Sequence, residues 1–191
     1  MGQVKNIIYA LLVLIDNVNE RIGNIAAYLL IPMTCIISYE VVMRYFFNAP
    51  SIWTMETSEY LLLAVVALGG GYTLLNRGHV NVDVIYSRLS ERRRAIIDCI
   101  TFCLFFAFIG AFVWQSWEAA IKALRIREYS PSFWAPPVYP IKALLPIGAF
   151  LILLQGLAKF IRDLAFAIRG EHLFDKPDKV AERPGSTGQK L

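Results

Sequence analysis

The sequence predicts an all-α integral membrane protein with four transmembrane helices, an N-terminal interfacial helix and both termini in the cytoplasm. The first observation is composition: 57% of the 191 residues are hydrophobic and 18% are charged, against about 45–50% and about 25% in an average soluble domain. The second is that the apolar residues gather into four long blocks. A helix needs roughly 20 apolar residues to cross a bilayer, and it satisfies its own backbone hydrogen bonds in lipid. The blocks lie at residues 22–47, 58–75, 95–117 and 138–160.

The distribution of basic residues predicts the orientation, because cytoplasmic loops carry an excess of lysine and arginine. Of the 19 lysines and arginines, 14 lie in the N-terminal arm, the loop after the second block and the C-terminal tail, and 5 lie on the opposite side. Both termini are therefore expected in the cytoplasm. We expect the cytoplasmic basic residues to contact anionic lipids. Nucleic acid is excluded as a partner, since it would need a basic face on a soluble fold.

Three regions follow along the chain. Residues 1–21 form an N-terminal arm, in which the apolar run 7–15 is too short to span and is followed by the polar run 16–21. An interfacial helix is preferred for it, and an extension of the first span is the alternative. Residues 22–162 form the four-helix membrane domain. Residues 163–191 form a polar cytoplasmic tail that is predicted to be disordered at its end.

The first span contains Pro32, which removes a backbone donor and predicts a kink. It also contains Glu40 near its outer end. A carboxylate inside a membrane is costly, so Glu40 is either a functional group or a partner of Arg44, four residues on. Pro50 ends this helix or opens the next one, and Ser51 is a candidate N-cap.

The second span opens with Trp53, Glu56 and Glu59. The carboxylates suit the positive end of a helix dipole, and the tryptophan suits the aromatic belt of a membrane protein. These structural roles do not explain why two carboxylates open a spanning helix. Further along, the glycines 69–71 predict close packing against another helix rather than local unwinding.

The remaining elements carry fewer polar groups. Asp98, near the cytoplasmic end of the third span, is expected to pair with an arginine of the preceding loop. The outer loop predicted at 118–139 is rich in proline and aromatic residues, so we expect it to hold a fixed shape. Lys142 at the start of the fourth span is expected to extend its ammonium toward the outer face.

No catalytic, cofactor or metal site is predicted. The two histidines, His79 and His172, lie outside the spans, whereas intramembrane haem takes ligands such as histidine from the helices. The sequence has no phosphate-binding glycine loop and no nucleophile elbow. The three cysteines lie within the spans and are interpreted as small apolar residues: Cys35, Cys99 and Cys103. The chain is therefore interpreted as a membrane scaffold that needs a larger partner, not as an enzyme.

Several stretches resemble the small membrane subunit of tripartite ATP-independent periplasmic (TRAP) transporters. They are the run from Arg44 to Glu56, the glycines of the second span, the run from Arg77 to Asp83, and the loop from Ser130 to Lys142 with the following Pro146-Ile147-Gly148. The resemblance covers about residues 21–162, with the motifs in matching order and the matching four-helix layout.

The resemblance implies a multi-pass subunit of the bacterial inner membrane. It implies a large membrane subunit that is driven by an ion gradient, expected to be of sodium ions, and a periplasmic substrate-binding protein that delivers an organic acid. The small subunit would brace the large one and help to dock the binding protein. The residues expected at these interfaces are Arg44, Pro50, Trp53, Glu56, Glu59, Arg77, His79, Asp83 and Lys142.

Two other hypotheses stay open at this point. One is a stand-alone small transporter or channel that uses Glu40 as its coupling carboxylate. The other is a membrane anchor for a redox enzyme, against which the lack of histidines in the spans already argues.

Overall fold

The computed structural model describes residues 2–76 and 91–169, and in these ranges the chain is helical apart from Leu29, Asn76 and two connections at 47–53 and 127–138. Both connections lie at the end of the bundle that is predicted to face outward, and they are called the outer connections below. The helices are α1 (Gly2–Tyr28), α2 (Leu30–Phe46), α3 (Thr54–Leu75), α5 (Glu91–Ile126) and α6 (Tyr139–Arg169). Four stretches are long and apolar enough to cross a membrane: Asn6–Phe46, Thr54–Leu75, Thr101–Ile126 and Tyr139–Arg162. The predicted all-α architecture with four spans is confirmed.

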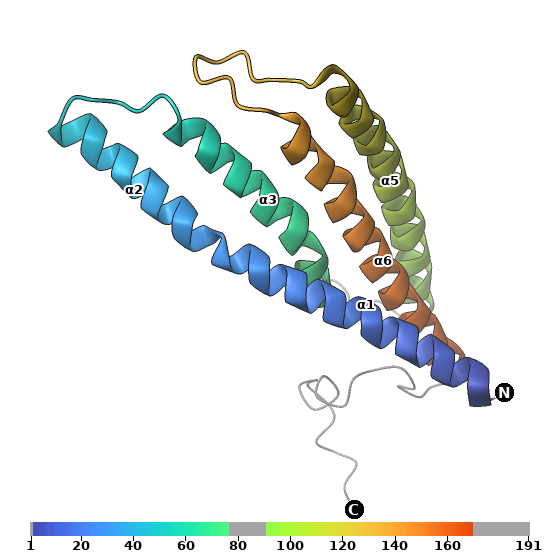
Figure 1. Cartoon of the computed structure of the whole chain (residues 1–191). Coiled ribbons are helices and arrows are strands. Elements are labelled where there is room, and N and C mark those ends of the chain that lie inside the picture. The colour runs from blue at the N-terminus through green and yellow to red at the C-terminus, as the bar shows by residue number, and fades with distance from the viewer. Residues whose placement is uncertain (1, 77–90, 170–191) are drawn as a thin grey trace, which may run out of the picture.

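Helices α1 and α2 form one long, nearly continuous rod (Figure 1). The interruption falls at Leu29, whose N–H donates to the carbonyl of Ala26 at 3.1 Å. Pro32 explains its position, because a proline has no N–H for the carbonyl four residues earlier, that of Tyr28. The helix passes without a break through the boundary predicted near residue 22, and the interfacial position of residues 1–21 stays a prediction.

Helix α3 lies between the α1–α2 rod and α6, and α5 packs on the other side of α6 (Figure 1). Small residues allow these close approaches. An added Cβ on Gly148 of α6 would collide with the backbone of Ala67 in α3, and one on Gly71 would collide with Asn19 of α1. An added Cβ on Gly70 would meet Ile152, but none would meet a neighbour at Gly69. Gly70 and Gly71 thus allow close packing, as predicted for the glycines of α3, whereas Gly69 does not.

Helix α5 extends farther than expected, which corrects the prediction that the outer loop starts at Glu118. The helix continues to Ile126. Residues 118–126 consist largely of alanine, glutamate, lysine, leucine and arginine, which have high intrinsic helix propensity even outside an apolar span. The predicted N-cap at Ser51 is also wrong, because α3 begins at Thr54 after the cap residue Trp53.

Some predicted residues lie outside the described parts of the chain. These are Arg77, His79 and Asp83 of the inner turn, the tail from residue 170 onward, and the side chain of Asp98. What was expected of them stays a prediction.

Candidate functional site

A polar cluster at the outer end joins α2 to the start of α3. The carboxylate of Glu40 accepts a hydrogen bond from the Arg44 guanidinium at 2.8 Å, which confirms the pairing expected from their spacing. Its second oxygen accepts from the Thr54 hydroxyl at 2.8 Å and from the Ser51 backbone N–H at 3.2 Å. Glu40 therefore fixes the connection between the two helices, while the Arg44 side chain stays 57% exposed.

The turn between α2 and α3 begins with a left-handed residue. Asn48 adopts a positive φ of 50°, and the N–H of Ala49 donates back to the carbonyl of Met43, six residues earlier, at 3.1 Å. A left-handed residue commonly ends a helix, and a proline such as Pro50 commonly follows it. Trp53 then stacks on Tyr39 of α2, with the ring centroids 6.0 Å apart.

The outer connection between α5 and α6 folds back on itself. Tyr129 and Pro137 form an antiparallel bridge, and the N–H of Val138 donates to the carbonyl of Glu128 at 2.9 Å. Both carboxylate oxygens of Glu128 accept from the Lys142 ammonium at 2.7 Å. Lys142 therefore closes the base of this loop through an ion pair with Glu128. The prediction that its ammonium extends toward the outer face did not include this pair.

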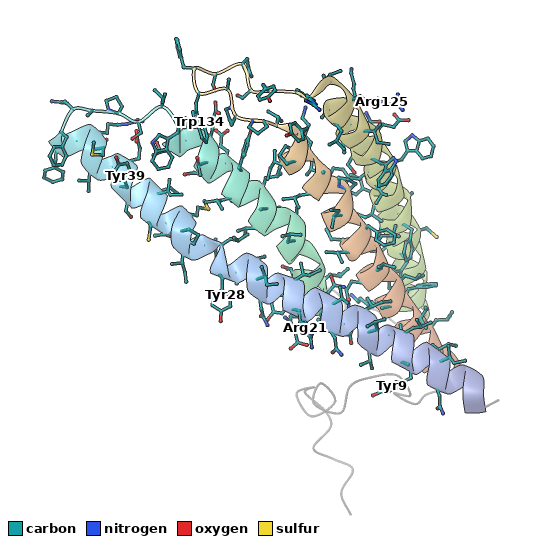
Figure 2. The ribbon with its side chains drawn as sticks, in the orientation of Figure 1. Tyr9, Arg21, Tyr28, Tyr39, Arg125 and Trp134 are labelled. Atoms are coloured by element: carbon teal, nitrogen blue, oxygen red, sulfur yellow. The ribbon has the colours of Figure 1, made fainter. Side chains whose placement is uncertain are left out.

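This outer loop also contacts the start of α3. The hydroxyl of Ser130 donates to Oε1 of Glu56 at 3.2 Å. Among the described residues, Oε2 of Glu56 and the hydroxyl of Tyr60, one turn on, are buried without a hydrogen-bond partner. The ring of Phe133 is fully exposed on the loop. Figure 2 places Arg125 and Trp134 at this same end of the molecule. The loop thus combines a closed base, an exposed aromatic side chain and a contact with α3.

A groove of about 470 Å³ lies between α2 and α3, and residues of the Glu40 cluster line part of it. Arg44 and Glu59 both line it, so the structure brings together predicted interface residues from the two helices. The lining residues are Met33, Ile37, Glu40, Val41, Arg44, Tyr45, Thr54, Met55, Ser58, Glu59 and Leu62.

A buried network at the other end of the bundle was missed by sequence reasoning. Asp16 of α1 pairs with Arg162 of α6 at 2.8 Å and accepts from Gln155 at 3.0 Å. Asn19 donates to Oε1 of Gln155 at 2.9 Å. Gln155 and Arg162 are seven residues apart and so share one helix face. That spacing, together with the polar run 16–21, is the signal that could have revealed the network.

The network joins α1 to α6 through buried polar side chains. Asp16, Asn19 and Gln155 are each no more than 2% exposed. Burying a polar group costs free energy unless it is hydrogen-bonded, so the bonds from Gln155 to Asp16 and from the Asn19 amide nitrogen to Gln155 tie α1 to the last span. Among the described residues, Oδ1 of Asn19 is buried without a hydrogen-bond partner. Figure 2 shows Tyr28 on the side of the α1–α2 rod that faces away from α3.

Comparisons with known proteins give a consistent result. The family model described as the DctQ component of tripartite ATP-independent periplasmic transporters matches residues 33–166. The isethionate TRAP transporter permease protein DctMQ of Oleidesulfovibrio alaskensis is 28% identical over 117 residues, which are 60% of this chain and 18% of that protein.

Two further relatives carry related names. The C4-dicarboxylate TRAP transporter small permease protein DctQ of Vibrio cholerae is 27% identical over 50% of this chain and 42% of its own length. A small permease protein assigned to a TRAP transporter in Haemophilus influenzae is 25% identical over 81% of this chain and 94% of its own length. The chain thus matches less than half the length of the first two relatives and nearly all of the third.

Proposed function

Because the chain belongs to the DctQ component family of tripartite ATP-independent periplasmic transporters, we propose that it braces a large membrane subunit and helps to dock a periplasmic binding protein. The family is a transporter component, so the chain is not an enzyme. Together with the four apolar helices, the family assigns the chain to the bacterial inner membrane as a multi-pass protein. The match over residues 33–166 is the observation that carries the proposal.

A large membrane partner is supported by two observations. The chain covers only 18% of the relative named permease protein DctMQ, in which a segment like this one is a small part of a longer permease. In this chain, α2 has no buried residue and exposes large apolar side chains such as Ile31, Val42 and Phe46. A second membrane subunit on this helix would cover a surface that the described parts of the chain leave open.

Docking of a soluble partner is supported by the outer loop. Its base is closed by the Glu128–Lys142 ion pair, and it presents the fully exposed ring of Phe133. A preformed loop loses little conformational entropy on binding, and exposed aromatic residues are frequent anchors of interfaces. The inner-turn residues Arg77, His79 and Asp83 are proposed to form a polar network beside the large subunit.

The transported substrate is proposed to be an organic acid that is taken up with sodium ions. Two relatives are named for isethionate and for C4-dicarboxylates, which are organic anions. Since those names belong to other proteins, they support the substrate class and no particular compound.

The first test is a pull-down of the chain from its native membrane in mild detergent, with the bound proteins identified by mass. We expect one large multi-helix permease in near-equal amount. A chain recovered alone or only with itself would overturn the proposal. Uptake by the chain alone in liposomes would instead establish the stand-alone transporter, which the three hydrogen bonds holding Glu40 in place argue against.

Replacing Glu56 with alanine is expected to weaken complex assembly or uptake by about tenfold, because a hydrogen bond to a charged group contributes about 1.5–3 kcal/mol. Its Oε2 is buried without a partner in the described chain, so a donor from the large subunit would satisfy it. The measurement is uptake at equal expression, with the exposed Glu118→Ala on α5 as the matched control. Unchanged uptake in the Glu56 variant would count against its interface role.

A further inference from the structure

The groove between α2 and α3 has an apolar part and a polar part. Met33, Ile37 and Val41 recur every four residues and line it from α2, while Leu62 lines it from α3. At the end nearer the α2–α3 turn, Glu40, Arg44, Ser58 and Glu59 add polar groups to the lining. Helices α2 and α3 diverge toward that end (Figure 1). An apolar channel with a charged mouth is the shape that suits an amphiphile.

The length of the groove matches one leaflet of a bilayer. Met33 and Arg44 are eleven residues apart on α2, which is about 16 Å along a helix axis. The hydrocarbon core is about 30 Å thick, so one leaflet contributes about 15 Å. When Arg44 lies at the membrane interface, Met33 lies close to the midplane.

The charges at the mouth favour a headgroup that carries both signs. Arg44 is mostly exposed and uses one nitrogen on Glu40, and a guanidinium has five N–H donors, so others are available for a phosphate. Glu59, an exposed second carboxylate on the groove, makes the mouth net negative. An ammonium group donates up to three hydrogen bonds to carboxylates, whereas a headgroup with only negative charge meets repulsion there.

We propose that this groove binds one phosphatidylethanolamine molecule from the leaflet nearer the α2–α3 turn. The phosphate lies on Arg44, the ammonium on Glu59, and an acyl chain along Met33, Ile37 and Leu62. This lipid fills the space between α2 and α3 and keeps the two helices apart at their outer ends. The proposal does not depend on which protein the chain binds.

The test uses the purified full-length chain and native mass spectrometry. The delipidated chain is incubated with equal amounts of phosphatidylethanolamine and phosphatidylglycerol that have the same acyl chains. We expect one phosphatidylethanolamine to stay bound in preference to phosphatidylglycerol. Arg44→Gln and Glu59→Gln are each expected to lower its retention by about tenfold, since each loses a charge-assisted hydrogen bond.

Two controls make the outcome decisive. Glu118→Gln changes a glutamate on α5, away from the groove, and is expected to retain the lipid as the wild type does. Leu62→Trp fills the groove and is expected to lower the retention of both lipids. Equal retention by all variants, a preference for phosphatidylglycerol, or no retained lipid would each overturn the proposal. The pull-down of the large subunit is scored separately, so either idea can fail without the other.

Discussion

Replacing Asp16 with alanine is expected to destabilise the folded chain by about 3–5 kcal/mol, because breaking a buried ion pair leaves its other charge without compensation. Asp16 is 2% exposed and its pair with Arg162 spans α1 and α6. The same change removes the acceptor of the Gln155 amide. The N-terminal helix would keep the bond from Asn19 to Gln155 but lose its ion pair with the last span.

Thermal unfolding of the purified chain in detergent, followed by tryptophan fluorescence, measures this effect. Glu128→Ala is the control, because its pair with Lys142 is partly exposed and such pairs contribute about 0–1 kcal/mol. The double variant Asp16→Leu with Arg162→Leu removes both charges and should lose less stability than the sum of the single changes. A midpoint for Asp16→Ala equal to that of Glu128→Ala would contradict the structural role of the network.

Replacing Gly148 with alanine is expected to cost about 1–3 kcal/mol, the usual penalty for overpacking a close contact. An added Cβ at this position would collide with the backbone of Ala67, including its carbonyl carbon and Cα. Backbone atoms cannot move aside as a flexible side chain can, so α3 and α6 would have to separate. This contact lies in the middle of the bundle. Its loss would also disturb the packing of α1 on α3 and of α5 on α6.

The matched control is Gly69→Ala, since an added Cβ there meets no neighbour within 4 Å. That change should be neutral or stabilise the chain by up to about 1 kcal/mol, because alanine is the better helix former. When the two variants are measured side by side, the unfolding midpoint of Gly148→Ala should fall below that of the wild type, and the midpoint of Gly69→Ala should equal or exceed it. A Gly148→Ala chain as stable as Gly69→Ala would disprove the close helix contact.

Features that depend on neighbouring residues along the chain could be predicted from the sequence. The Glu40–Arg44 pair follows from a spacing of four on one helix, and it is confirmed at 2.8 Å. The break near Pro32 follows from a missing N–H, and it falls at Leu29. The outer end of α5 was predicted poorly, because the apolar pattern stops near Trp117 while the strong helix formers after it continue the helix to Ile126.

Contacts between distant segments could not be predicted. Asp16 and Arg162 are 146 residues apart, and Ser130 and Glu56 are 74 apart. The resemblance directed attention to Glu56 but not to its contact with the outer loop. Likewise, Arg44 and Glu59 were both expected at an interface, yet only the crossing of α2 and α3 places them on one groove.

The sequence by itself determined the class of this protein, the number and order of its spans, and its family. Those properties rest on apolar length and local motifs, which the bilayer thickness and the helix period fix without reference to the rest of the chain. The tertiary structure alone decided which polar residues meet: the buried network of α1 and α6, the outer loop on α3, and the groove beside α2. The physical reason is that helices in a membrane choose their neighbours through the close packing of small residues and a few polar contacts, and these depend on all helix faces at once.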